Sequence, residues 1–202
     1  MGMKFNPARL ARLNDPARTR YLDIDMIWKG FGVQRPRVVV DLGAGTGFFS
    51  VRFAPLLAEA GRIHACDMSD LMVDWMKTNL TPLEKKSVVP LKVAENSIDL
   101  PDGSVDLFYM INVYHELAEP ARLLAEARRL LRPDGPVAIV DWKKQETSFE
   151  GERHGPPVER RVEPEAVIAD LEAAGLADIR RHDSLPLHFF LVARASSASR
   201  AT

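Results

Sequence analysis

The sequence predicts an α/β fold in which a mostly parallel sheet carries helices on both faces. Short apolar runs rich in β-branched residues alternate with stretches of helical period for most of the chain. In addition, the run Val38–Val40 leads directly into Asp41 and a glycine-rich loop, the strand–loop–helix junction found in parallel sheets. With 202 residues the chain is long enough to bury the core of one such domain.

The expected elements follow from hydrophobic period and from turn residues. Expected strands occupy residues 37–42, 62–67, 88–93, 105–111, 137–142, 177–182 and 188–193. Expected helices occupy residues 46–60, 69–80, 120–132 and 163–174, after a helical N-terminal segment over 7–32 that breaks at Asn14-Asp15-Pro16. Ser69 and Asp70 are expected to cap the helix that follows the second strand, and Pro120 suits a first helical turn.

Residues 143–162 depart from this pattern. They are polar, contain several glycines and prolines, and have no clear period. A loop this long inside a compact domain is usually functional or disordered. We therefore expect three parts: a helical cap over residues 1–36, the main domain over 37–194 and a flexible tail over 195–202.

Composition narrows the classes of function. The 27 basic and 28 acidic side chains leave a formal net charge of −1, without the basic surplus typical of nucleic-acid binding. The single cysteine, Cys66, excludes an internal disulfide, and no spacing of His, Asp or Glu suggests a metal site. No apolar run reaches the roughly 20 residues of a membrane span, and no secretory signal is evident. We expect a cytoplasmic protein that binds neither nucleic acid nor membrane.

The glycine run is the most specific motif. Asp41 is followed by glycines at every second position from Gly43 to Gly47, and glycine lets a backbone approach a ligand closely. Dinucleotide-binding loops read G-x-G-x-x-G, whereas this chain has Phe48 at the third glycine position. The pattern resembles motif I of the class I S-adenosylmethionine-dependent methyltransferases. The resemblance covers roughly residues 37–194 and implies a Rossmann-like, seven-stranded sheet whose last strand is antiparallel.

Asp67, at the end of the second expected strand, is the next residue that points to the cofactor. A carboxylate there can accept hydrogen bonds from both hydroxyls of a ribose, and the resemblance places an acid at this position. The alternative is that Asp67 caps the next helix, for which Ser69 and Asp70 already suffice. A protein that binds NAD would also carry an acid there, so Asp67 by itself does not separate the two cofactors.

The resemblance assigns further residues to the cofactor, S-adenosylmethionine. It places Met68, Glu95 and Asn96 at the adenine ring, Asn112 near the methionine part and Asp41 near the amino group. The full set of expected cofactor-binding residues is Asp41, Leu42, Gly43, Ala44, Gly45, Gly47, Asp67, Met68, Ala94, Glu95, Asn96 and Asn112.

Methyl transfer by in-line displacement requires the protein mainly to align a nucleophile with the sulfonium methyl group. Tyr114 and His115 follow the fourth expected strand and are the candidate catalytic residues. His115 could act as a general base, since its ordinary pKa lies near working pH; the alternative is that it hydrogen-bonds to backbone and shapes the site. Tyr114 and Tyr21 could face the sulfonium, whereas Phe48 is expected to pack its helix on the sheet.

Other candidates are weaker. Asp141, at the end of the fifth expected strand, and His154, in the polar loop, could contribute to the site, whereas His182 and His188 are expected to be structural or exposed. The N-terminal segment either forms a lid over the cofactor, with Tyr21 facing it, or simply packs on the domain.

The acceptor is less well encoded than the cofactor. Methyltransferases of exocyclic base amines carry an Asn/Asp-Pro-Pro-aromatic motif after the fourth strand, and this chain reads Asn112-Val113-Tyr114-His115 there. The motif spacing resembles small-molecule enzymes near the ubiquinone/menaquinone C-methyltransferases. Oxygen, nitrogen, sulfur, carbon and metalloid acceptors all stay open. The alternatives to a methyltransferase of small molecules are an NAD-dependent oxidoreductase and a non-catalytic relative that acts as a sensor or partner subunit.

Overall fold

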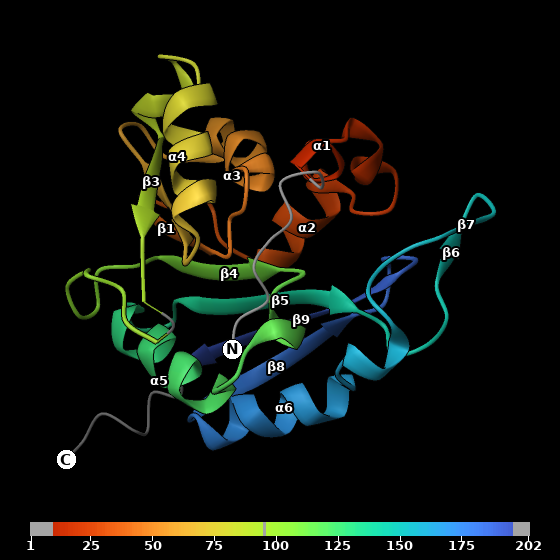
Figure 1. Ribbon diagram of the computed structural model, residues 1–202. Helices are drawn as coiled ribbons and strands as arrows, with labels where there is room; N and C mark the ends of the chain where they lie inside the picture. Colours follow the sequence, from red (N-terminus) through yellow and green to blue (C-terminus); the bar gives the residue numbers. More distant parts are fainter. Residues whose placement is uncertain (1–9, 95, 196–202) are drawn as a thin grey trace.

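The computed structural model describes residues 10–94 and 96–195, which form one seven-stranded sheet and its covering helices (Figure 1). The strands are β1 (Val38–Leu42), β2 (Arg62–Asp67), β3 (Val88–Lys92), β4 (Leu107–Ile111), β5 (Pro136–Trp142), β8 (Leu176–His182) and β9 (His188–Ala195). Their order across the sheet is β3-β2-β1-β4-β5-β9-β8. The first five run parallel, and β9 is antiparallel to both β5 and β8. The predicted fold class, with its antiparallel last strand, is confirmed.

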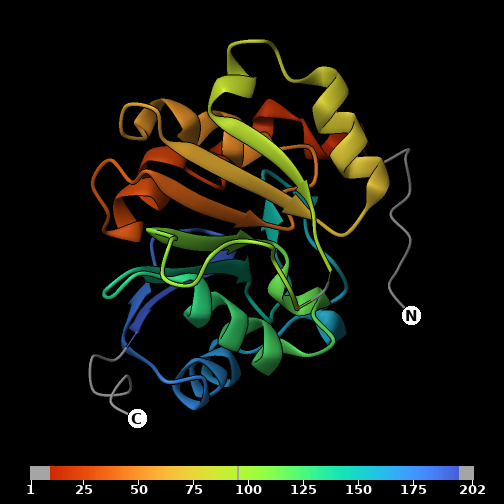
Figure 2. The same cartoon turned by 90° about the vertical axis from the view of Figure 1, so that its left-hand side faces the viewer.

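Helices cover both faces of the sheet (Figures 1 and 2). One face carries α2 (Ile24–Phe31), α3 (Phe48–Phe53) and α4 (Asp70–Asn79), and the other carries α5 (Pro120–Leu130) and α6 (Pro164–Ala173). A short α1 (Leu10–Leu13) precedes them. This is the two-sided cover that a parallel sheet, apolar on both faces, requires.

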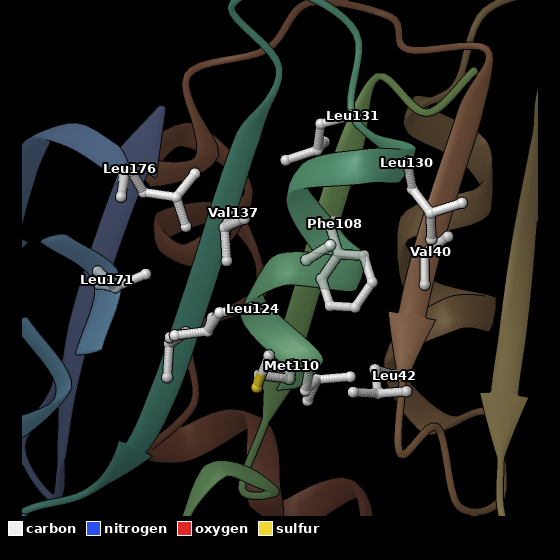
Figure 3. Packing of buried hydrophobic residues seen from close by; sticks show 14 of the residues in the cluster. Val40, Leu42, Phe108, Met110, Leu124, Leu130, Leu131, Val137, Leu171 and Leu176 are labelled. Carbon is white, nitrogen blue, oxygen red and sulfur yellow. The ribbon is translucent and has the colours of Figure 1, made fainter. Parts of the chain in front are cut away.

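Alternate strand residues divide the core between the two faces. Val40 and Phe108 pack with α5 and α6, as Figure 3 shows, whereas their neighbours Val39 and Leu107 pack with α2 and α3. All four are 0% exposed. Full burial of such side chains stabilises the fold by about 1.5–3 kcal/mol each, so the carboxyl ends of β1 and β4 are held rigidly side by side.

Two helical segments are shorter than predicted. The N-terminal segment is α1, a 3₁₀ turn over Pro16–Arg20 and then α2, which Asp23 caps by accepting a hydrogen bond from the Met26 backbone N–H. The helix expected over residues 46–60 ends early, because α3 gives way to a 3₁₀ turn at Pro55, which has no N–H for the α-helical ladder.

A buried arginine orders the segment over residues 143–162, which the sequence showed only as a polar loop. The short strands β6 (Ser148–Phe149) and β7 (Glu152–Arg153) form a hairpin that projects from the sheet (Figure 1). Arg161 is 2% exposed. Its guanidinium donates hydrogen bonds to the carbonyl oxygens of Lys143, Gln145, His154 and Pro156 and to Oγ1 of Thr147. One side chain therefore satisfies backbone oxygens along most of the loop.

The ends of the chain were predicted only in part. Residues 1–9 and 196–202 lie outside the described residues, and with them most of the expected tail and the start of the expected cap. Ala195 still belongs to β9, so the domain extends one residue beyond its predicted end. In the described part of the chain, no helix is long and apolar enough to cross a bilayer.

Candidate functional site

The glycine loop leaves the carboxyl end of β1 with positive φ at Gly43, Gly45 and Gly47. A Cβ atom on Gly43 would lie 2.4 Å from Val113 Cγ2, so that glycine is needed for the loop to pack against Val113, the second residue after β4. Among the described residues, a Cβ atom on Gly45 would meet only Leu13 Cδ1, at 3.6 Å. The loop is thus tightly packed at Gly43 and more open at Gly45, where a ligand has room to approach the backbone.

Asp67, at the end of β2, is tied to this loop. Its Oδ2 accepts a hydrogen bond from the Gly45 N–H, and its Oδ1 accepts one from the Ser69 N–H, each at 2.8 Å. Ser69 stands at the N-cap position of α4, as predicted, but its side chain makes no capping hydrogen bond, and the Asp67 carboxylate accepts from its backbone N–H instead. Each carboxylate oxygen keeps a free lone pair, so these two bonds are compatible with further donors.

Asp41 lies deeper, at 3% exposure, on the face that carries α3. Its Oδ2 accepts a hydrogen bond of 2.6 Å from Ser50 Oγ. The Tyr109 hydroxyl lies near the same carboxyl group without a well-formed hydrogen bond. Burial raises the pKa of Asp41 to about 7, against the opposing effect of Ser50. A cationic group brought next to Asp41 would therefore stabilise the ionised form.

Three buried polar oxygens at the same edge of the sheet have no hydrogen-bond partner among the described residues. They are Thr46 Oγ1 in the glycine loop, Asn96 Oδ1 after β3 and Asn112 Oδ1 after β4. Asn112 also has φ +62°, and its backbone N–H donates to Val140 O. Leaving such a group unpaired costs about 1–3 kcal/mol, so this edge is suited to a ligand that carries several hydroxyl or amine donors.

His115 and Asp141 form a buried pair at the ends of β4 and β5. The His115 side chain is 7% exposed, and its Nδ1 lies 2.8 Å from Asp141 Oδ1. The backbone N–H groups of His115 and Trp142 also donate to the Asp141 carboxylate. Burial lowers the pKa of His115, but the hydrogen bond and charge of Asp141 outweigh it and raise the pKa above its ordinary value.

The other ring nitrogen of His115, Nε2, makes no hydrogen bond within the described part of the chain. Nε2 lies 3.7 Å from Glu116 Oε1, which is beyond hydrogen-bond distance. An imidazole held by a carboxylate at Nδ1, with Nε2 unpaired, is arranged to accept a proton from a bound group. The sequence named both residues, but only the register of β4 on β5 brings them together.

Tyr114 lies away from this pair. Its ring is 3% exposed in the core on the α5 side, and its hydroxyl donates a hydrogen bond of 2.6 Å to Asp170 Oδ2 on α6. Phe48 packs in the core of the opposite face, 4% exposed, as predicted. The geometry therefore brings His115, but not the Tyr114 hydroxyl, to the candidate site.

The remaining expected cofactor residues have varied surroundings. Leu42 is buried, and the Ala44 N–H donates to Cys66 O, which holds the glycine loop on β2. Met68 is 52% exposed beside the end of β2, and Ala94 pairs with Ser97 in an isolated bridge. Glu95 lies outside the described residues.

Sequence reasoning missed a group of rings that meets at the end of β5. Tyr21, Trp142, Phe149, His154 and His188 form one aromatic cluster, with Tyr21 in contact with the other four rings. The sequence left open whether His188 is structural or exposed. The side chain is 0% exposed, so it is part of the interior. The cluster depends on the pairing of Trp142 with His188 between β5 and β9. The order of residues alone does not reveal that pairing.

The comparisons with known proteins agree with this geometry. A family model described as a methyltransferase domain matches residues 40–139. The crystal structure of an S-adenosylmethionine-dependent methyltransferase from Aquifex aeolicus is 34% identical, with a TM-score of 0.87 over 96% of this chain and 100% of that one. The chain belongs to the class I S-adenosylmethionine-dependent methyltransferases. Its cofactor is S-adenosylmethionine, which decides the choice that Asp67 left open and sets the NAD-dependent alternative aside.

Two other similar proteins are matched over about half of their own length. The ubiquinone/menaquinone biosynthesis C-methyltransferase UbiE of Citrobacter koseri is 25% identical over 127 residues, or 60% of this chain and 51% of that protein. The chain thus spans about half the length of this curated relative. Phosphoethanolamine N-methyltransferase 2 of Haemonchus contortus, solved in complex with S-adenosyl-L-methionine, shares the fold at a TM-score of 0.68 and 14% identity, over 87% of this chain and 52% of that one.

The residues present fit this cofactor. The open backbone at Gly45, the carboxylates of Asp67 and Asp41 and the unpaired oxygens of Asn96 and Asn112 all lie along the carboxyl ends of β1 to β4. A ribose supplies two hydroxyl donors, and the methionine part supplies an ammonium group. Both kinds of donor match acceptors that the protein alone leaves unused.

Proposed function

We propose that this methyltransferase transfers the methyl group to a small molecule by in-line displacement, with His115 as the general base. The observation that carries the proposal is the buried His115–Asp141 pair, whose free Nε2 lies at the edge of the sheet that also holds the glycine loop. The near-neutral net charge supports a small acceptor rather than a nucleic acid.

The cofactor would lie across the carboxyl ends of the strands. Gly45 and its neighbours would form the backbone cradle, Asp67 would accept from the ribose hydroxyls, and Asp41 would face the ammonium group. Met68, with Ala94, Glu95 and Asn96, would flank the adenine, and Asn112 would meet the methionine part. The remaining members of the set, Leu42, Gly43, Ala44 and Gly47, would shape the loop.

The chain's own residues do two things in this proposal. When bound, S-adenosylmethionine supplies a sulfonium methyl group that is already activated for displacement. Asp141 keeps the Nδ1 proton and the ring orientation of His115, so that Nε2 can take the proton of the acceptor. Alignment of the acceptor in a water-poor site can contribute about 7–11 kcal/mol to the lowering of the barrier.

Tyr114 takes a different role in this proposal from the one the sequence suggested. Through its bond to Asp170, it would fix the 3₁₀ turn over Tyr114–Glu116 and so position His115. The N-terminal segment would cap the site, since Tyr21 reaches the aromatic cluster at the end of β5.

Calorimetry and a methylation assay test the proposal together. S-Adenosylhomocysteine should bind the protein and NADH should not. With labelled S-adenosylmethionine, a panel of small hydroxyl, amine, thiol and carbanion acceptors should yield labelled product, and His115→Ala should lower the rate while leaving the affinity for S-adenosylhomocysteine near normal. Label transferred to protein or nucleic acid, but to no small molecule, would contradict the proposal, and cofactor binding without any transfer would favour a sensor or partner subunit.

A further inference from the structure

The aromatic cluster joins three distant parts of the chain. Tyr21 comes from the N-terminal segment, Phe149 and His154 come from the hairpin after β5, and Trp142 and His188 are paired across β5 and β9. The Trp142 and His188 ring centroids are 4.1 Å apart, and those of Tyr21 and His154 are 4.9 Å apart. Tyr21 lies nearly parallel to His188, at 8° and 6.1 Å. Asp141, which holds His115, directly precedes Trp142 in β5.

His188 is the unexplained member of this cluster. It is 0% exposed, yet among the described residues neither of its ring nitrogens has a hydrogen-bond partner. Burial and the positive charges of Arg18, Lys143 and Arg161 lower its pKa well below the ordinary value, so the ring is neutral. A neutral imidazole offers one donor and one acceptor. Buried polar groups in proteins are almost always paired, so a ligand is the natural partner for His188.

The charges around the cluster limit what that ligand can be. The guanidinium of Arg161 is committed to oxygen atoms of its own loop, and Lys143 Nζ donates to Leu185 O. The Arg18 guanidinium lies over the Phe48 ring and, in the described part of the chain, donates to Leu13 O. The Asp141 carboxylate, on the residue before Trp142, is already paired with His115. A positively charged acceptor would therefore meet the like charges of Arg18, Lys143 and Arg161, whereas a neutral or anionic one would not be repelled by them.

Resting on the proposed function, we propose that the aromatic cluster is the acceptor site and that the acceptor is a small hydroxylated arene. Its ring would pack against Tyr21 and Trp142, and a polar substituent would pair with His188. In the transfer, the bond between the methyl carbon and sulfur breaks with its electron pair left on sulfur, and a bond forms between that carbon and the hydroxyl oxygen. The hydroxyl proton passes to His115 Nε2, which yields a methyl ether and S-adenosylhomocysteine.

The test uses the full-length protein saturated with S-adenosylhomocysteine and titrated with catechol, benzylamine or cyclohexanol in a calorimeter. Catechol should bind at least tenfold more tightly than benzylamine, which is cationic, and than cyclohexanol, which lacks an aromatic ring. His188→Phe keeps an aromatic ring and removes both nitrogens, and it should weaken catechol binding at least tenfold.

Two controls separate binding from folding. His182 on β8 stacks on Phe190, and its Nε2 is also buried and unpaired, but it lies outside the cluster; His182→Phe should leave catechol binding unchanged. His188→Phe should keep the affinity for S-adenosylhomocysteine within about twofold and should not lower Tm, because it replaces an unpaired buried polar ring by an apolar one.

The outcomes keep this inference apart from the proposed function. Equal catechol binding by wild type and His188→Phe, no catechol binding by wild type, or tighter binding of benzylamine would each overturn the acceptor class. Catechol binding that depends on His188, without formation of a methyl ether from labelled S-adenosylmethionine, would keep the site and overturn the transfer through His115. Failure to bind S-adenosylhomocysteine would overturn the proposed function, and with it the methyl transfer to the arene that rests on it.

Discussion

Asp67 holds two backbone amides and still has lone pairs for a ligand, so its removal should affect the cofactor first. We expect Asp67→Ala to weaken S-adenosylhomocysteine binding at least tenfold, the scale of about 1.4 kcal/mol for a lost charge-assisted pair. Asp70→Ala is the matched control, because Asp70 begins α4 nearby but its carboxylate is exposed and pairs with Lys92. Calorimetry measures both variants, and an unchanged affinity in Asp67→Ala would remove the ribose assignment.

The His115–Asp141 pair makes a prediction about pH. Because Asp141 raises the pKa of His115, the general base should become active only as pH rises through a value above the ordinary pKa of histidine, near 6.5. Asp141→Asn removes the charge, so the acid limb of the kcat/KM profile should move to lower pH while the rate itself falls, by about 10²-fold or more. The profile of methyl transfer against pH measures this.

The same pair also makes the stability of the fold depend on pH. Activity should rise with pH, whereas the contribution of this pair to stability should fall. A histidine whose pKa is raised in the folded state contributes stability that is complete below the unfolded pKa, and this contribution is lost as pH rises through the folded pKa. Denaturation of Asp141→Asn should therefore show its largest deficit on the acid side of neutrality. In the pH profile of kcat/KM, an acid limb that stays in place in Asp141→Asn would mean that His115 is not the group whose titration controls the rate.

At the scale of elements, the loop over residues 143–162 depends on Arg161. Arg161→Leu would remove the guanidinium donor from four carbonyl oxygens and from the Thr147 hydroxyl. Of the four carbonyls, Lys143 O keeps the Gln145 N–H and His154 O keeps the Thr147 hydroxyl, whereas those of Gln145 and Pro156 lose this donor. We expect the free energy of unfolding to fall by about 2–4 kcal/mol and limited proteolysis within the loop to become much faster. Cofactor binding should persist, because within the described residues the side-chain hydrogen bonds of Arg161 go to residues 143–156 and not to the glycine loop.

Arg153→Leu provides the control for this prediction. Arg153 lies in the same hairpin but is exposed and pairs only with exposed Glu146, so its loss should cost no more than about 1 kcal/mol. Equal proteolysis of the loop in wild type and Arg161→Leu would show that the hydrophobic contacts of the hairpin suffice to order it.

At the scale of the whole molecule, Asp41 links folding to pH. Its pKa rises from 3.8 to about 7 on burial, so the folded protein holds this proton over a range in which the unfolded chain has lost it. Stability should therefore fall as pH rises from about 4 to 7, by at most about 4 kcal/mol. Asp41→Asn should abolish this part of the loss and be more stable than wild type at pH 8, as measured by urea denaturation at pH 5 and pH 8.

Cofactor binding should reverse the advantage of the Asn variant. An ammonium group placed at Asp41 favours the carboxylate, so Asp41→Asn should bind S-adenosylhomocysteine more weakly even though its apo form is more stable. Asp74→Asn, which alters an exposed carboxylate on α4, should match wild type in both respects. Parallel pH dependence of stability in Asp41→Asn and wild type would contradict the assignment of a buried, protonated Asp41.

The fold could be predicted because its signals are local. Most strands of the sheet are short, mainly apolar runs, and the glycine loop and Asp67 sit at fixed offsets from β1 and β2. Differences occurred where local rules compete: Pro55 shortened α3, and at the start of α4 the Asp67 carboxylate accepts a backbone hydrogen bond whereas the Ser69 side chain makes no capping bond. In such places neighbouring groups compete for the same backbone hydrogen bonds, and the order of residues does not show which group makes them.

The sequence by itself determined the glycine loop, the acid at the end of the second strand and the order of elements, because each depends on residues within a few positions of one another. Only the tertiary structure decided that His115 meets Asp141, that Arg161 collects the loop carbonyls and that His188 is buried unpaired against Trp142. The reason is physical. Pairing of β4 with β5 and of β5 with β9 fixes these contacts, and strand register is set by the packing of the whole sheet rather than by any one segment.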